Sequence, residues 1–158
     1  MPTIYEKLKS DHDTHRDLLA KLVETEGNSD ERRELWKSFY YDVSAHAAAE
    51  EVAFYSPLLA ESDGQAEGRH SVAEHKELDD LLQELNDTDM SSPGWLTRLR
   101  TMKDRYEHHI NEEEDDIFPV AKDVIGADRS GEIAAEFAER KKEERTLVDE
   151  KAEEALKD

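Results

Sequence analysis

The sequence contains no cysteine, and this absence removes several classes of protein at once. Disulfide scaffolds, zinc–thiolate sites, iron–sulfur clusters and thiol catalysis all need cysteine, so none of them applies here. Long apolar runs are also missing: no stretch of about 18 apolar residues occurs, and residues 1–10 have no apolar signal-peptide core. We therefore expect a soluble protein of a reducing cytoplasm that does not enter a membrane.

Basic residues are few relative to acidic ones. The chain of 158 residues carries 41 Asp and Glu against 21 Lys and Arg, which gives a formal net charge of −20. Nucleic-acid binders need a basic face to displace the counterions of phosphate groups, and an anionic membrane surface repels an acidic protein. Both partners are therefore excluded, and the length indicates one domain or one domain with an appendage.

Glycine and proline are scarce as well, with six and four residues, and they separate segments of helical periodicity. Five helices are expected, over about residues 3–26, 28–57, 64–86, 92–119 and 128–158, with the fourth reaching at most Gly126. Gly27 fits a residue that ends the first helix, and residues 28–31 resemble a capping box for the second. Ser92 and Pro93 fit the start of the fourth helix.

No segment alternates as a β-strand does, so the sequence predicts an all-α fold. Short connections make consecutive helices antiparallel neighbours. The simplest arrangement is an antiparallel up-down-up-down four-helix bundle over residues 1–125, with a C-terminal fifth helix in an extension over residues 126–158.

The two halves of the expected bundle repeat each other with an offset of 63 residues. In the second helix an inward stripe advances in steps of three and four residues, which is typical of one helix face. It consists of Trp36, Phe39, Val43, His46, Glu50 and Phe54. The matching residues of the fourth helix are Leu99, Met102, Tyr106, His109, Glu113 and Ile117. Apolar residues match apolar residues across the offset, and histidine and glutamate match their own kind.

The first and third helices follow the same offset, so each half contains a histidine, a second histidine 34 residues later and a glutamate four residues after that. The six residues are His12, His46, Glu50, His75, His109 and Glu113. They place four imidazoles and two carboxylates at one level of the core, on stripes without lysine or arginine. Burying unpaired carboxylates is costly, so a bound metal cluster is the expected source of positive charge.

Imidazole and carboxylate ligands without sulfur suit iron, manganese, zinc or nickel. Two metal ions fit better than one, because six ligands with pseudo-twofold symmetry divide into three and three. If Glu50 and Glu113 both bridge, the protein fills roughly eight of about 12 octahedral positions. The remaining positions are left for an oxygen bridge and an exogenous ligand, which on a redox metal indicates O2, NO or peroxide.

Four segments resemble hemerythrin HHE cation-binding domains. They are DHDTHRDLL (residues 11–19), HAAAEEVAFYSP (46–57), RHSVAEHKELDDLL (69–82) and HHINEEEDDIFP (108–119). The resemblance covers about residues 3–120 and implies a four-helix bundle around a non-haem di-iron centre. It also implies one of the roles found in that family: O2 carriage or sensing, NO binding, peroxide breakdown or iron sensing. The ligand positions of the family fall on the same six residues that the repeat selects.

The sequence departs from the oxygen-carrying members of this family at two positions. Ser71 stands where they have a further histidine in the third helix, and Glu114 stands where they have an aspartate in the fourth. The repeat favours Glu113 over Glu114 as the ligand. His70 is a seventh candidate metal ligand, for which the indications are balanced. The repeat matches it with Lys7, whereas the resemblance favours it, with a local π turn bringing it to the metal.

Polar residues beside the six also receive an interpretation. His15 lies on an inward stripe but matches Leu78, so we interpret it as a core histidine or one that contacts a ligand. His108 is interpreted as a surface residue, and Tyr106 as a core residue, with a hydrogen bond into the site as the alternative. Three acids next to the ligands, Glu51, Glu112 and Glu114, are expected either to hydrogen-bond to the ligands or to be solvated. Asp11 and Glu74 could also accept hydrogen bonds from imidazoles, but exposed charge is the preferred interpretation for both.

The preferred function is that of a non-haem di-iron protein with two iron ions and an oxygen bridge. It would reversibly bind O2, NO or a related small oxidant for sensing, storage or scavenging. The alternatives are a di-iron oxidoreductase that decomposes hydrogen peroxide, an iron-handling or iron-sensing protein, and a purely structural bundle. Manganese or zinc is the alternative to iron.

The charged fifth helix has few apolar residues, namely Ile133, Phe137, Leu147 and Val148. They form a narrow seam that caps the bundle or mediates dimerisation, and a solvated tail helix is the alternative interpretation. A monomer or homodimer is expected. Any signal would pass to an unidentified protein partner, since these residues include no output domain.

Overall fold

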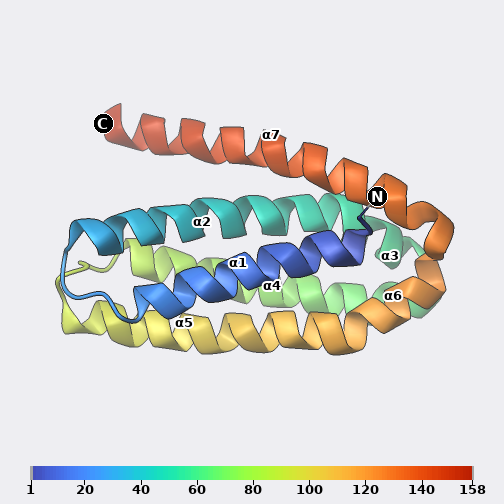
Figure 1. The fold of residues 1–158 in the computed structure, drawn as a ribbon, viewed down its shortest axis with the longest axis horizontal. Helices are drawn as coiled ribbons and strands as arrows, with labels where there is room; N and C mark the ends of the chain where they lie inside the picture. The colour runs from blue at the N-terminus through green and yellow to red at the C-terminus, as the bar shows by residue number, and fades with distance from the viewer. Residues whose placement is uncertain (1, 158) are drawn as a thin grey trace.

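The fold is a bundle of four long helices with a fifth helix laid along it (Figure 1), as seen in a computed structural model that describes residues 2–157. The bundle helices are α1 (Ile4–Leu22), α2 (Asp30–Glu50), α4 (Gln65–Asn86) and α5 (Pro93–Glu112), and the fifth is α7 (Ser130–Lys157). They alternate in direction, and no strand occurs within residues 2–157. The predicted all-α, up-down-up-down bundle with a fifth helix is confirmed. None of the helices described is both long and apolar enough to cross a membrane.

The second and fourth predicted helices each contain a π-helical turn that the sequence did not indicate. Helix α2 continues through η1 (Glu51–Tyr55) into α3 (Ser56–Ala60), and α5 continues through η3 (Glu113–Ile117) into α6 (Phe118–Ile125). Short 3₁₀ turns, η2 (Ser62–Gly64) and η4 (Ala127–Arg129), complete the connections.

A proline explains the position of each π turn. Pro57 and Pro119 have no backbone N–H, and their rings clash with the carbonyl four residues earlier. The residue before each proline bonds one position further back, so the N–H of Ser56 donates to the carbonyl of Glu51. In the same way the N–H of Phe118 donates to the carbonyl of Glu113. By contrast, α4 is regular throughout, so the π turn considered near His70 is absent.

The first connection differs from the predicted one. Helix α1 ends at Leu22, four residues before the predicted end, because the hydroxyl of Thr25 donates to the carbonyl of Leu22 and Arg32 donates to Thr25. Gly27 lies in the following turn with a φ of 54°, rather than at the helix end. Ser29 caps α2 in place of the predicted capping box. The predicted start of α5 at Ser92 and Pro93 is confirmed.

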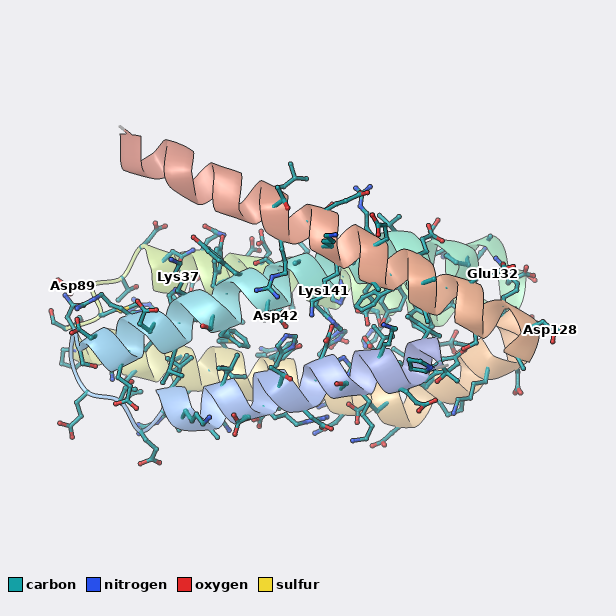
Figure 2. All side chains as sticks on the ribbon, turned by 45° about the horizontal axis from the view of Figure 1, so that its top comes forward. Lys37, Asp42, Asp89, Asp128, Glu132 and Lys141 are labelled. Carbon is teal, nitrogen blue, oxygen red and sulfur yellow. The ribbon has the colours of Figure 1, made fainter. Side chains whose placement is uncertain are left out.

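Helix α7 is fastened to α2 over its first half. Figure 2 shows Lys141 reaching from α7 toward Asp42 of α2, and its ammonium lies 3.0 Å from carboxylate oxygens of both Asp42 and Asp11. Ile133 and Phe137 are buried, whereas Leu147 is 46% exposed. The side chain of Val148 lies outside the described residues. The first half of α7 therefore caps the bundle, which is one of the three interpretations given for this segment. The domain boundary at 125/126 stays a prediction.

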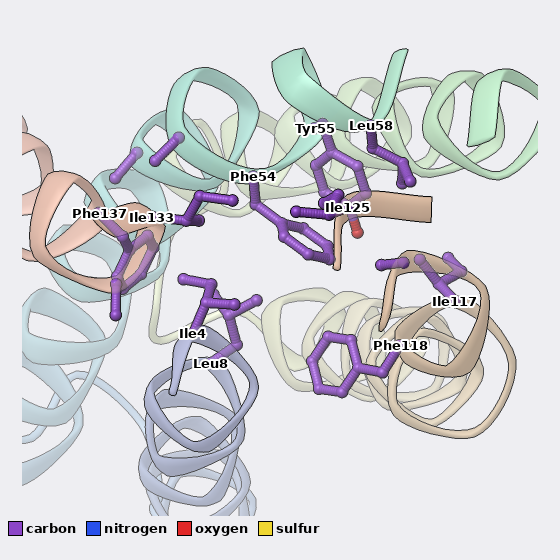
Figure 3. Packing of buried hydrophobic residues seen from close by; sticks show 14 residues of the cluster. Ile4, Leu8, Phe54, Tyr55, Leu58, Ile117, Phe118, Ile125, Ile133 and Phe137 are labelled. Atoms are coloured by element: carbon purple, nitrogen blue, oxygen red, sulfur yellow. The ribbon is translucent and has the colours of Figure 1, made fainter. Parts of the chain in front are cut away.

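Two apolar clusters enclose one polar layer of the bundle. The first fills the end where α3, α6 and the start of α7 meet (Figure 3); its residues include Ile4, Leu8, Phe54, Tyr55, Ile117, Phe118, Ile133 and Phe137. The second fills the opposite end; its residues include Leu19, Leu22, Trp36, Phe39, Val43, Trp95, Leu99 and Met102. His12 lies between Leu8 and Leu19 on α1, so the candidate ligands form the layer between the clusters.

The burial of α7 predicts a specific stability difference. Phe137→Ala removes a ring that is 2% exposed and packs 5.5 Å from the ring of His46. We expect it to lower the free energy of unfolding by about 3–5 kcal/mol, measured by urea denaturation. The matched control, Leu147→Ala on the same helix, should change it by no more than about 0.5 kcal/mol. Equal effects of the two substitutions would contradict the described packing of α7.

Candidate metal centre

The six residues selected by the repeat meet in the polar layer, and all are buried. Their ligand atoms form two groups, in each of which the atoms lie within 4.8 Å of one another, and both groups contain the carboxylates of Glu50 and Glu113. The first group adds His12 and His46 to these carboxylates. The second adds His75 and His109. Two cation positions that share two carboxylates match this arrangement.

The imidazole Nε2 atoms all face the two shared carboxylates. One carboxylate oxygen of Glu113 lies 3.3 Å from Nε2 of His12, and its other oxygen lies 3.3 Å from Nε2 of His109. In the same way, one carboxylate oxygen of Glu50 lies 3.0 Å from Nε2 of His75, and its other oxygen lies 3.5 Å from Nε2 of His46. These separations bring every candidate ligand atom to the same small volume.

Four atoms of this layer have no hydrogen-bond partner in the described protein, although each is buried. They are Nε2 of His12, both carboxylate oxygens of Glu50 and Oε1 of Glu113. Within the described residues, no lysine or arginine pairs with either carboxylate. Buried polar groups without partners are costly and rare in proteins, so the donor set fits bound cations.

A carboxylate stands behind each of the four histidines and accepts a hydrogen bond from its Nδ1 atom, at 2.7–3.1 Å. We call these four the backing carboxylates; they are Glu114 behind His12, Asp11 behind His46, Glu51 behind His75 and Glu74 behind His109. A proton held at Nδ1 leaves Nε2 free to bind a metal, and the carboxylate fixes the ring orientation. The preferred interpretation of Asp11 and Glu74 as exposed charges is therefore wrong.

The offset of 63 contained the signal for this arrangement. It matches Asp11 with Glu74 and Glu51 with Glu114, as it matches the histidines that these acids support. Each half of the bundle thus repeats its ligands together with the residues behind them.

Comparison with known proteins agrees with this geometry. The hemerythrin HHE cation binding domain matches residues 3–121 of the chain. The chain belongs to this family. A crystal structure of a hemerythrin HHE cation binding domain-containing protein from Mycobacterium kansasii, an Rv2633c homolog, aligns with a TM-score of 0.83 and 28% identity. That alignment covers 93% of this chain and 90% of the other, and it confirms the fold.

Curated relatives of this hemerythrin-family chain extend the comparison. The uncharacterized protein Rv2633c of Mycobacterium tuberculosis is 29% identical over 120 residues, which are 76% of this chain and 73% of that protein. A DNA nickase of Nostoc is 25% identical over 134 residues, or 85% of this chain. The match spans only 38% of the length of the nickase.

The two halves of this HHE domain differ in the aromatic residue beside the ligands. The offset matches Tyr55 with Phe118; Tyr55 packs against the ring of His75, and Phe118 stacks on that of His12. Only Tyr55 carries a hydroxyl, which donates a hydrogen bond to Glu113. Burial, together with the nearby carboxylates, raises the pKa of Tyr55 well above 10, so this hydroxyl keeps its proton.

His15 and Tyr106 form a separate hydrogen-bonded chain beside the ligand layer. Burial lowers the pKa of His15 to about 4, so its ring is neutral near pH 7. Its Nε2 donates to Asp42 at 2.6 Å, and its Nδ1 accepts from the hydroxyl of Tyr106 at 2.5 Å. The ring also packs against that of His46, which confirms His15 as a buried histidine that contacts a ligand.

The structure places His70 and His108 outside the ligand layer, on the exposed side of α4 and α5. His70 lies in neither of the two buried ligand groups. Because α4 has no π turn, its helical position directs the side chain away from the core. His108 is a surface residue, as predicted.

All four candidate-ligand histidines have raised pKa values in the metal-free chain. Burial by itself would lower the pKa of His12, but the carboxylates of Glu113 and Glu114 beside the ring outweigh burial and raise it to about 9. The pKa values of His75 and His109 also rise to about 9, because each ring faces two carboxylates despite its burial.

This difference predicts how the stability of the metal-free protein depends on pH. In the unfolded chain the histidine pKa is about 6.5, so the stabilisation is complete below about pH 6.5 and is lost as the pH rises through about 9. We expect the free energy of unfolding, measured in urea with a chelator present, to fall across this window. Metal affinity should change oppositely, because metals bind neutral imidazole. A metal-free protein that gains stability from pH 6.5 to pH 9 would contradict the described hydrogen bonds.

Proposed function

We propose that the chain holds two iron ions at His12, His46, Glu50, His75, His109 and Glu113 and reversibly binds a small oxidant such as O2 or NO. One observation carries the proposal: six buried ligands converge in two groups that share two carboxylates, and four of their atoms have no hydrogen-bond partner.

The ligand chemistry supports iron. Imidazole and carboxylate without thiolate suit first-row transition metals, and the shared carboxylates suit a pair of ions. If both carboxylates bridged two ions, the protein would fill roughly eight of about 12 octahedral positions and leave room for a further ligand. When bound, iron would supply the electrons and the open coordination positions that an oxidant requires.

The covering of the centre supports a very small ligand. His75 and His109 are 7% and 5% exposed, and the other four ligands are 2% exposed or less. A recess of about 30 Å³ reaches His109 and Tyr106, and this is about the volume of one water molecule. A wider recess of about 300 Å³ between α2 and α4 reaches His75. Because the six candidate ligands are at most 7% exposed, a diatomic molecule or peroxide fits the approach to them.

Metal analysis and absorption spectroscopy test this function together. Protein purified without oxygen should contain about two iron ions per chain. Exposure to O2 or NO should change its visible absorption, and removal of the gas should restore the first spectrum. Glu113→Gln should lose most of the iron, because it removes a shared ligand. The control Asp116→Asn, an exposed acid in the same π turn, should retain it.

Each other outcome has a defined meaning. A folded bundle without stoichiometric metal would overturn the ligand assignment. Stoichiometric zinc or manganese would retain the centre and overturn its reaction with O2 through iron. Irreversible oxidation would overturn reversible binding and favour the second candidate.

The second candidate is a di-iron oxidoreductase that converts two molecules of hydrogen peroxide into one of O2 and two of water. The backing carboxylates favour it, because an anion behind each imidazole strengthens the ligand and stabilises a more highly charged metal. The proton on the hydroxyl of Tyr55, held at Glu113, is a nearby source for proton transfer.

Peroxide turnover distinguishes the two candidates. An oxidoreductase should evolve O2 from hydrogen peroxide over many cycles, and Tyr55→Phe should slow this by about a hundredfold with the iron content unchanged. Phenylalanine already occupies the matching position 118, so the ring should be tolerated. The control Tyr41→Phe, on the outer side of α2, should leave the rate unchanged. Absence of sustained O2 evolution would reject this candidate.

A further inference from the structure

A second group of histidine and glutamate lies on the outside of the bundle, away from the buried ligands. His70 and Glu74 are four residues apart on α4, and His108 and Glu112 are four residues apart on α5, so each pair shares one helix face. The faces meet, because Nε2 of His70 lies 2.8 Å from Glu112 across the two helices. We call these four residues the surface cluster.

We propose that the surface cluster binds one divalent transition-metal cation, separate from the two positions of the buried centre. Ligand atoms of His70, Glu74 and Glu112 lie within 4.8 Å of one another, which is close enough to share an ion. Nε2 of His70 is 3.3 Å from Glu74, and Nε2 of His108 is 3.3 Å from the second oxygen of Glu112. His70, Glu74 and Glu112 therefore offer one imidazole and two carboxylates to one point, and His108 lies beside them at the second oxygen of Glu112.

The charge of the surface cluster is uncompensated. In the described part of the chain, Glu74 and Glu112 pair with histidines, and no lysine or arginine lies within salt-bridge distance of either. Two carboxylates without a lysine or arginine beside them carry negative charge that a divalent cation would neutralise.

The other half of the bundle shows what compensates the matching carboxylate. The offset of 63 matches Glu74 with Asp11, and the ammonium of Lys141 on α7 lies 3.0 Å from Asp11. The residues that match His108 and Glu112 are Ala45 and Ala49, so that half offers no cluster. Lys141 of α7 thus places a positive charge beside Asp11, the carboxylate behind His46. A cation bound from solution in the surface cluster would place one beside Glu74, the carboxylate behind His109.

The ligand types select the class of cation. Calcium and magnesium prefer oxygen ligands alone, whereas imidazole with carboxylate suits zinc and ferrous iron. The side chains of His70 and His108 are 52% and 72% exposed, so a cation reaches them without any movement of the helices. Exposure also leaves water to complete the coordination.

Glu74 connects the surface cluster to the buried centre. Its Oε1 lies 3.3 Å from Nε2 of His70 and 2.9 Å from Nδ1 of His109. A cation in the surface cluster is therefore one carboxylate and one imidazole away from the buried ligand atoms.

Calorimetric titration with Zn2+ tests the proposal. Protein whose buried centre has been loaded with iron, and then freed of excess metal, should bind one further Zn2+ per chain. The double variant His70→Ala/His108→Ala should weaken this binding by at least about a hundredfold, since loss of even a supporting residue costs about tenfold. Glu77→Gln removes the same charge as loss of a cluster glutamate but lies outside the cluster on α4, so it should bind Zn2+ as the wild type does.

The test does not depend on the buried centre. If the centre holds no iron, the same titration of the metal-free chain should still give a difference of one Zn2+ between wild type and double variant. Both substituted residues are exposed, so the free energy of unfolding should be unchanged. Imidazole NMR signals of His70 and His108 should shift with the first added Zn2+. Equal Zn2+ binding by wild type and double variant, or unshifted signals, would overturn the proposal.

Discussion

Two carboxylates and four imidazoles occupy a layer that apolar clusters cover on both sides, so the charge of Glu50 and Glu113 has to be neutralised inside the protein. Without metal, protons on the histidines serve this purpose, because the neighbouring carboxylates raise the histidine pKa values. Metal ions replace the protons when bound. The backing carboxylates serve both states, because each holds its imidazole with Nε2 toward the centre.

The two halves of the bundle repeat the candidate ligands but differ in the residues around them. Tyr55 donates to Glu113, but its counterpart Phe118 has no hydroxyl to offer Glu50. His15 forms a hydrogen-bonded chain in one half, where the other half has Leu78. The two cation positions therefore have the same ligand types but different neighbouring hydrogen-bond donors. Any functional difference between the two positions would arise from these neighbours.

Most of the fold and all six candidate ligands follow from the sequence, because helix periodicity and a 63-residue repeat are local patterns. The same repeat also relates the backing carboxylates to one another, so they could have been predicted from the sequence. They were not, because single acidic residues next to a buried stripe are usually solvated. The early end of α1 was out of reach, because it depends on Arg32 contacting Thr25 across the connection. The covering by α7 rests on a few apolar residues within a charged segment, and its contact at Lys141 requires knowledge of the neighbouring helix.

The π turns give the bundle a place where the length of the chain can vary. Seven positions separate Glu50 from Pro57, but only six separate Glu113 from Pro119, so the two halves differ by one residue here. A regular helix would carry such a difference along its whole length as a rotation of every later side chain. In this chain the difference lies between the last ligand of each half and the proline that follows it, where each helix is locally widened by a π turn. The one-residue difference between the halves is thus accommodated at η1 and η3, and the four-residue spacing from each ligand histidine to its glutamate is the same in both halves.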